Sequence, residues 1–413
     1  MKHPSTTKLS LSQRVHSLFQ GLLHPAPQGF QAQAWKLQRQ VDMTLIYAIG
    51  FLLLLGLVMV YSASIGLPES PLFKGKGSTY FLIRQSAFLL IGLMLALLVF
   101  QVPVARWNAY APYLFLFAVG LLVVVLIPFI GKLANNARRW IPVGPFTLQP
   151  SELMKFAVIV FAASYCVKKK EVITSFVNGM MPLLIVIIIL GVLLLAEPDL
   201  GATVVMAAVA LGILFLGGSS IMPIIVMGLG LIISASVVIA TSNRARRVLA
   251  FLDPWSPEFA KTEGFQLTNS MIAFGRGELF GVGLGNSAEK LNHLSEAHTD
   301  FILAIVAEEL GFIGICVVVF CYGLIIFKAF SIGRRAHEQN KQFDSLVAQG
   351  IGLWLGLQAG IHLCVNAGAL PTKGLTLPFI SYGGSALLMS MAAMALLVRI
   401  DYEGRLSQRG QLL

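Results

Sequence analysis

The sequence from Gly275 to Gly311 reads GRGELFGVGLGNSAEKLNHLSEAHTDFILAIVAEELG, a polar connection that leads straight into an apolar run. Glu296, His298 and Asp300 lie at the junction. Charged groups are costly inside the hydrocarbon of a membrane, so acids at the edge of an apolar segment are a functional-site hypothesis by default. This stretch predicts a membrane protein whose chemistry lies at the edge of one span.

The composition agrees with a membrane protein. The 413 residues are 56% hydrophobic and only 12% charged, whereas an ordinary soluble domain carries roughly 25% charged residues. Apolar stretches of about 20 residues recur along the chain, and a helix of that length crosses roughly 30 Å of hydrocarbon. Strands are not expected, because the runs lack the alternation of a membrane barrel. The predicted fold is all-α, a polytopic helical membrane protein.

Ten spans are expected, at about 43–64, 80–100, 110–130, 151–167, 178–196, 200–217, 220–241, 300–328, 346–368 and 378–399. Together they define a membrane domain over 43–399. Residues 1–42 are expected to form a flexible basic cytoplasmic tail, and 400–413 a second cytoplasmic tail. The segment 242–299 becomes one large outer loop between spans 7 and 8.

The formal net charge of +11 could indicate a nucleic-acid partner. The basic residues, however, lie in short connections between spans, such as 168–170 and 334–341. That distribution is typical of topology signals, which mark the cytoplasmic side. We therefore expect both termini in the cytoplasm and no nucleic-acid partner.

Asp300 has two interpretations. It directly precedes an apolar run, so it could be a helix N-cap, a role worth about 1 kcal/mol. Yet Glu296, His298 and the downstream Glu308 make a denser polar cluster than a cap needs. A carboxylate partly desolvated at this edge would have a raised pKa, which suits a general base.

Other outer-face residues could serve the same site. Arg138 and Arg139 stand outside, against the positive-inside trend, and paired guanidinium groups suit a phosphate or diphosphate. The adjacent Trp140 is more typical of an interfacial anchor. Glu152 and Lys155, at spacing i, i+3, can meet on one helix face, and such a pair is more often structural than catalytic.

Three further features remain ambiguous in the sequence. Lys373 is either a solvated loop lysine or a contact for an anionic headgroup. Ser381 begins a run of small residues that allows close helix packing, or it belongs to the site. The acids of Glu197-Pro-Asp199 mark a turn or hold a divalent cation. The whole pattern indicates an outward-facing cleft for an amphiphile with an anionic head.

Several motifs follow one another along the chain: Ala137-Arg-Arg-Trp140, Gln149-Pro-Ser-Glu152 through Lys155, Glu197-Pro-Asp-Leu-Gly201, Glu296-Ala-His-Thr-Asp300, Ala307-Glu-Glu-Leu-Gly311 and Pro371-Thr-Lys-Gly-Leu-Thr-Leu-Pro-Phe-Ile-Ser-Tyr-Gly-Gly384. Their combination resembles the SEDS family, named for shape, elongation, division and sporulation. The last motif, with Arg399-Ile-Asp-Tyr-Glu-Gly-Arg405 after the last span, resembles the division branch of that family more than its elongation branch.

The resemblance implies a peptidoglycan glycosyltransferase that polymerises lipid II into β-1,4-linked glycan strands. It implies work at the outer face of the bacterial inner membrane, at the division septum. Its expected partners are a class B penicillin-binding protein and small bitopic division proteins that activate the pair. A divalent cation, Mg²⁺ or Mn²⁺, is a candidate cofactor, and no metal ligands are assigned.

The residue essential for polymerisation in that family corresponds to Asp300. The expected substrate-binding residues are Arg138, Arg139, Trp140, Glu152, Lys155, Glu296, His298, Lys373 and Ser381. Two other functions are open at this point. A lipid II flippase would need polar residues accessible from both faces, and the inner connections offer only basic ones. A non-catalytic division scaffold would not need the outer acids.

Overall fold

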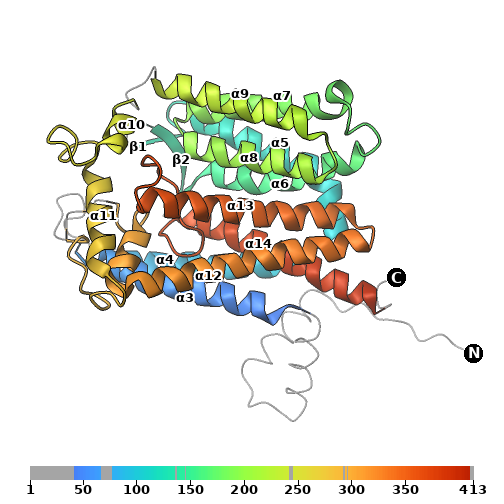
Figure 1. Cartoon of the computed structure of the whole chain (residues 1–413). Coiled ribbons are helices and arrows are strands. Elements are labelled where there is room, and N and C mark those ends of the chain that lie inside the picture. The colour runs from blue at the N-terminus through green and yellow to red at the C-terminus, as the bar shows by residue number, and fades with distance from the viewer. Residues whose placement is uncertain are drawn as a thin grey trace, which may run out of the picture.

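The computed structural model describes residues 41–66, 77–134, 137–144, 146–240, 245–291, 294 and 296–409, with the backbone alone for 231–240. All but the last two residues of the tail predicted over 1–42 lie outside the described residues. The described chain is mainly helical, and Figure 1 shows its long helices side by side in one bundle.

The helices are α3 (Met43–Ser64), α4 (Tyr80–Gln101), α5 (Val104–Leu126), α6 (Pro150–Lys168), α7 (Met181–Ala196), α8 (Leu200–Leu216), α9 (Ile221–Ala240), α10 (Ala245–Leu252), α11 (Phe265–Gly277), α12 (Ile302–Glu338), α13 (Gln342–Asn366) and α14 (Gly384–Gln408). A π-helical turn, η3 (Phe176–Met180), leads into α7. The short helices α10 and α11 lie at one end of the bundle (Figure 1).

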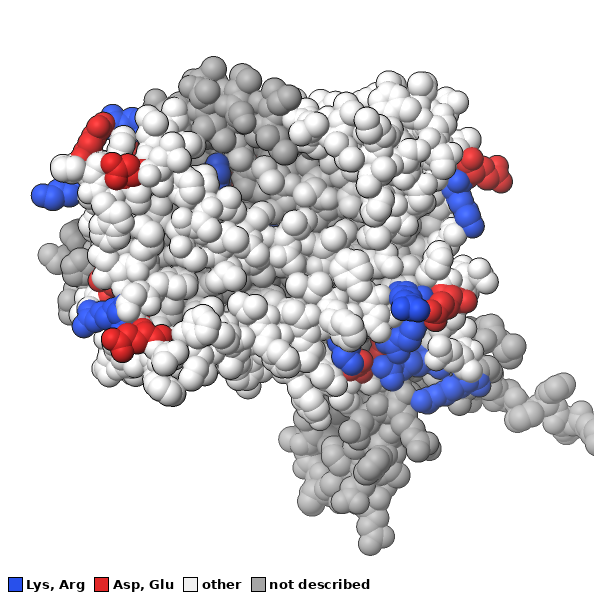
Figure 2. Space-filling model, viewed as in Figure 1, with Lys and Arg blue, Asp and Glu red and all other residues white. Residues whose placement is uncertain are grey.

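Among the described residues, eight helical segments are long and apolar enough to cross a membrane. Two shorter apolar helices, α8 and the first part of α9, coincide with the remaining two expected spans. The prediction of a polytopic helical membrane protein is confirmed. Figure 2 shows the charged side chains gathered mainly toward the two ends of the molecule, with a broad uncharged band between them on the face in view.

The connection between α5 and α6 departs from the prediction, because it forms a small antiparallel sheet. Strands β1 (Lys132–Ala134), β2 (Ala137–Val143) and β3 (Phe146–Leu148) pair in the order β1-β2-β3. Gly144, with φ of 58°, supplies the left-handed conformation that a tight turn between β2 and β3 requires. The expectation of no strands was wrong here, since it considered only strands long enough to span a membrane.

Helix α12 also departs from the expected uninterrupted run, because it is broken at Gly311. This glycine has φ of 68°, and a Cβ atom on it would lie 2.4 Å from the backbone nitrogen of Gly281. The carbonyl oxygens of Glu308 and Glu309 do not accept from the next turn of the helix. They accept from the N–H groups of Val282 and Gly283 in the preceding outer loop, at 2.9 and 3.1 Å. The first segment, 302–310, is a short helix in the protein interior, almost all of it buried.

The described ends of the chain meet at one end of the bundle, opposite α10, α11 and the sheet (Figure 1). The backbone N–H of Asp42 donates to Asp401 at 2.9 Å, and Asp42 pairs with Lys328 at 2.8 Å. The beginning of α3 and the ends of α12 and α14 therefore lie together. We refer to this end as the inner end and to the opposite one as the outer end.

Candidate active site

Asp300 lies half-buried in the turn that precedes α12. The N-cap position of α12 is Phe301, and among the described residues no N–H of the first turn donates to the Asp300 carboxylate, so Asp300 does not act as an N-cap. A Cβ atom on Gly374 would lie 3.0 Å from Asp300 Oδ2, and this glycine therefore lets the last outer loop run close against the carboxylate. The carboxylate is positioned by its surroundings for a role other than capping.

The last outer loop, residues 367–383, holds the segment before α12 in place. Ser381 Oγ donates to the carbonyl oxygen of Thr299 at 2.6 Å and accepts from a backbone N–H of its own loop at 2.8 Å. The N–H of Tyr382 donates to the carbonyl oxygen of His298 at 2.9 Å. Ser381 thus joins the site as a residue that fixes the backbone beside Asp300.

His298 and Glu296, both expected in the site, lie on either side of this turn. The His298 ring is buried between Phe81 and Tyr382, at centroid distances of 4.5 and 5.6 Å. Burial lowers the pKa of His298 to about 4, so the imidazole is neutral at pH 7. Glu296 Oε2 accepts from Thr299 Oγ1 at 2.7 Å. His298 therefore packs the turn, whereas Glu296 adds negative charge to it.

The Arg139 side chain contacts the turn between α7 and α8 because a bulge distorts the strand that carries it. Lys132 and Leu133 of β1 face residues on β2 that are two positions apart, so Arg139 is the extra residue of a β-bulge. A bulge bends the strand and redirects a side chain. Arg139 donates from Nε to the carbonyl oxygen of Glu197 at 2.9 Å and from Nη2 to that of Pro198 at 2.5 Å.

The Glu197–Asp199 turn carries two acids in different surroundings. Asp199 accepts from the N–H of Ala202 at 3.1 Å and from Ser151 Oγ at 3.4 Å. Glu197 is fully buried, and neither of its carboxyl oxygens has a hydrogen-bond partner among the described residues. Burial, with the charge of Asp199, raises the pKa of Glu197 to about 8 against the opposing effect of Arg139.

The same charges act on Asp300. Burial raises the pKa of Asp300 to about 7, the negative charge of Glu296 adds to the rise, Arg139 opposes it and Asp199 adds slightly. Arg139 and Asp300, far apart in the sequence, thus belong to one electrostatic site at the outer end. A carboxylate with a pKa near the working pH is suited to remove a proton as a general base.

Glu152 and Lys155 form a buried ion pair deeper in the bundle. Lys155 Nζ lies 2.8 Å from both Glu152 oxygens and 2.9 Å from Gln358 Oε1. Trp354 Nε1 donates to the same oxygen, and Gln358 Nε2 donates to the carbonyl oxygen of Thr376, each at 2.8 Å. The pair therefore ties α6 to α13 and, through Gln358, to the last outer loop.

Arg138 and Trp140 flank the bulged arginine on β2, and Lys373 belongs to the last outer loop. All three are half-buried. They lie in the segments that carry the rest of the site, and their contact with a substrate stays a prediction.

Glu308 and Glu309 do not join the acids at the edge of the span. Glu309 accepts from Lys290 Nζ at 2.7 Å and from Ser62 Oγ at 2.6 Å, and Glu308 accepts from the Ser287 hydroxyl. Both carboxylates contact the large outer loop, and Glu309 also joins that loop to α3 through Ser62. The expectation that Glu308 contributes to the polar cluster around the junction was wrong.

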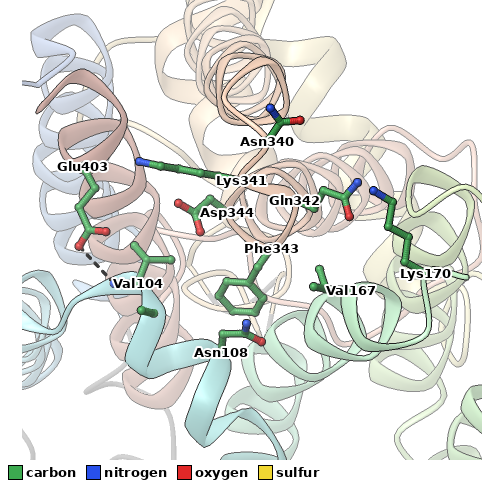
Figure 3. Close-up of a pocket in the computed structure, with 11 residues that line it drawn as sticks. Val104, Asn108, Val167, Lys170, Asn340, Lys341, Gln342, Phe343, Asp344 and Glu403 are labelled. Atoms are coloured by element: carbon green, nitrogen blue, oxygen red, sulfur yellow. Dashed lines mark hydrogen bonds between the residues drawn. The ribbon is translucent and has the colours of Figure 1, made fainter. Parts of the chain in front are cut away.

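A cavity of about 460 Å³ opens at the inner end (Figure 3). It is lined by Val104, Ala105, Asn108, Val167, Lys170, Asn340, Lys341, Gln342, Phe343, Asp344 and Glu403. These residues include the beginning of α13, whereas Asp300 lies beside the other end of that helix, about 37 Å away for 25 residues. None of the predicted site residues lines this cavity.

Sequence reasoning missed two buried amides of α13, Gln358 and Asn366, which contact the last outer loop and the segment before α12. The available signal was an amide inside an apolar run, which must find a hydrogen-bond partner when buried. Among the residues that the structure describes, no group of three or more His, Cys, Asp or Glu side chains is placed to hold a metal ion.

Comparison with known proteins agrees with this architecture. Two solved structures resemble the chain in fold. One, a peptidoglycan synthase complex in which polymerisation and crosslinking are coordinated, matches with a TM-score of 0.70 and 26% identity over 88% of this chain and 98% of its own. The other, the rod shape determining protein RodA of Thermus thermophilus, matches with a TM-score of 0.64 and 26% identity over 87% and 96%.

Sequence relatives are closer. A probable peptidoglycan glycosyltransferase FtsW of Polynucleobacter necessarius is 49% identical over 90% of this chain and 88% of its own length. One of the same description from Burkholderia thailandensis is 49% identical over 89% and 80%. The sequence pattern of the FtsW, RodA and SpoVE cell cycle proteins matches residues 43–406. The chain belongs to this family of cell cycle proteins.

Proposed function

We propose that this protein is a peptidoglycan glycosyltransferase that polymerises lipid II at the outer face of the bacterial inner membrane during septal division. The observation that carries the proposal is the half-buried Asp300 carboxylate, whose pKa is raised to about 7 beside the cationic Arg139. The FtsW relatives named above supply the reaction class, and the outer-end site supplies a base and a cation for it.

In this mechanism Asp300 accepts the proton of the 4-hydroxyl of the N-acetylglucosamine of an acceptor lipid II. The freed oxygen attacks the anomeric carbon of N-acetylmuramic acid at the lipid-linked end of the growing strand. Undecaprenyl diphosphate leaves with the electron pair of the broken bond. One displacement inverts an α-linked donor into a β-1,4 bond, so no covalent enzyme intermediate is needed.

The leaving diphosphate gains negative charge as the bond breaks, and a fixed cation that meets this charge speeds the step. Arg139 is the cation we assign to it, and a divalent cation bound to the diphosphate would supply further positive charge. Two backbone carbonyls already fix the guanidinium, so it need not reorganise during the reaction.

We propose a class B penicillin-binding protein as the partner that crosslinks the new strands, with small bitopic division proteins as activators. The similar peptidoglycan synthase complex, in which polymerisation and crosslinking are coordinated, supports such a pairing. We propose the division septum as its location, which agrees with membership of a family of cell cycle proteins.

A lipid II flippase is the second candidate, because the inner cavity provides acids and amides that the sequence did not reveal. Asp344 and Glu403 line it with Lys170 and Lys341 (Figure 3). Between this cavity and Asp300, however, α13 is tightly packed, with Trp354 fully buried. The outer end, by contrast, supplies both a base and a cation for polymerisation, so the polymerase is preferred.

The test is glycan-strand synthesis from lipid II by the purified chain, with and without its crosslinking partner. Asp300→Asn and Asp300→Ala are expected to lose activity by about 100-fold or more, the contribution of a general base. Asp253→Asn, in an exposed acid of the large outer loop, is the control and should keep the parental rate. Polymerisation by Asp300→Ala at the parental rate would refute the proposal.

A further inference from the structure

Asn366, the last residue of α13, has a fully buried side chain that contacts the backbone on both sides of the beginning of α12. Its Nδ2 donates to the carbonyl oxygen of Asp300 at 3.0 Å. Its Oδ1 accepts from the backbone N–H of Ala304 at 3.2 Å. The first N–H groups of a helix lack the usual partner one turn earlier. The Ala304 N–H donates to the carbonyl oxygen of Phe301 at 3.0 Å and shares its hydrogen with Asn366 Oδ1 from another helix.

Both hydrogens and the oxygen of the Asn366 amide have hydrogen-bond partners. The second hydrogen of Nδ2 goes to the carbonyl oxygen of His362, one turn earlier in α13, at 2.9 Å. The backbone carbonyl of Asn366 in turn accepts from Ser270 Oγ of α11 at 2.7 Å. The amide is thus anchored to α13 and α11, and only one orientation of it serves both the Asp300 carbonyl and the Ala304 N–H.

We propose that Asn366 is a positioning residue that holds the Asp300 carboxylate at its working place in the outer-end site. The inference rests on the proposed function, since it assumes that Asp300 acts on a substrate. Asp300 lies in a turn outside any helix, and backbone rotation there would displace its carboxylate relative to Arg139 and the bound sugar. Displacing a catalytic group by about 1 Å can cost about 100-fold in rate.

The test uses full-length protein with Asn366→Leu, which keeps the number and branching of the side-chain heavy atoms and removes every amide hydrogen bond. Asn366→Asp keeps the acceptor for Ala304 and replaces the donor to Asp300 with an oxygen. Asn108→Leu, an amide of the inner cavity far from Asp300, is the matched control. Ser270→Ala loosens Asn366 without altering its amide and serves as a second variant if Asn366→Leu does not fold.

We expect kcat of lipid II polymerisation to fall about 10- to 100-fold in Asn366→Leu and Asn366→Asp, with KM little changed, and less in Ser270→Ala. In Asn366→Leu, infrared titration of the Asp300 carboxyl is expected to show a pKa lower than the parental one, because a released carboxylate is better hydrated. The Asp300 signal is isolated by subtracting the spectrum of the double variant Asn366→Leu/Asp300→Asn.

Parental kcat in folded Asn366→Leu would overturn the proposal. So would a loss of kcat that comes with a lower melting temperature and an unchanged Asp300 titration, since that result describes a purely structural residue. Failure of the proposed function looks different: Asp300→Asn would then still polymerise lipid II, while the infrared titration would continue to report whether Asn366 positions the carboxyl.

Discussion

Arg139 donates to the carbonyl oxygen of Glu197 at 2.9 Å, so the bulged residue of the outer sheet holds the turn between α7 and α8. A second bond goes to the carbonyl oxygen of Pro198. Two parallel donors in a planar group are a property of arginine that lysine cannot reproduce. The guanidinium therefore has a fixed place, set by the backbone of two segments, from which its charge acts on Asp300.

The first prediction concerns this guanidinium. Arg139→Ala is expected to slow polymerisation by about 100-fold, the scale of losing one stabilising donor at a developing charge. Arg139→Lys should recover only part of the rate. The loss should be larger on lipid II analogues that keep the diphosphate than on a diphosphate-free analogue. Lys132→Ala, an exposed cation on the same sheet, should keep the parental rate. Equal losses on both analogues would contradict the role of Arg139.

The second prediction concerns pH. A general base acts when ionised, and the pKa of Asp300 is about 7, so the rate should fall as the pH drops through about 7. Glu296→Gln removes the second largest cause of that raised pKa, and the acid limb of the profile should move to lower pH. Arg139→Gln should move it to higher pH. Profiles of kcat/KM for the three proteins measure both shifts. Superimposable acid limbs would rule out this assignment of the base.

The third prediction concerns stability. The pKa of Glu197 is about 8 in the folded protein against an ordinary value of 4.5. The folded state therefore retains a proton that the unfolded state releases, and the stability contributed by this proton is lost as the pH rises from 4.5 through 8. The melting temperature should fall over that range, and less in Glu197→Gln.

Its control is Glu278→Gln, in an exposed acid of the large outer loop, which should fall as much as the parent. Thermal unfolding in detergent at several pH values measures all three proteins. A parallel decline in Glu197→Gln and in the parent would show that another group causes the pH dependence.

Much of the fold could be predicted from short stretches of sequence. Each span is one continuous apolar run, so length and composition are enough to place the helices approximately. The acids and cations of the outer end could also be gathered into one region, because an even number of spans assigns the connections to two sides. These inferences need no knowledge of how any two helices pack.

The remaining features depend on contacts between distant segments. The bulge that aims Arg139 arises from the register between β1 and β2, which no single strand encodes. Gly311 looks like any glycine in an apolar run, and its break becomes necessary only because Gly281 packs against it. Asn366 acquires its role from a turn that precedes a different helix. Sequence patterns therefore identified candidate residues at the outer end but not the distant segments that hold them in place.

The fourth prediction separates structure from catalysis for Glu152 and Lys155, whose side chains are only 7% and 1% exposed. Lys155→Met leaves a buried charge without its partner, which costs about 3–5 kcal/mol of unfolding free energy. Adding Glu152→Gln should restore part of that loss. The exposed pair Arg334 and Glu338 is the control, with a coupling below about 1 kcal/mol. Double-mutant cycles on unfolding free energy, with polymerisation rates of the folded variants, make the comparison.

If the pair is structural, activity follows stability and the double variant regains both. A double variant with restored stability and no polymerisation would instead place the ion pair in the reaction.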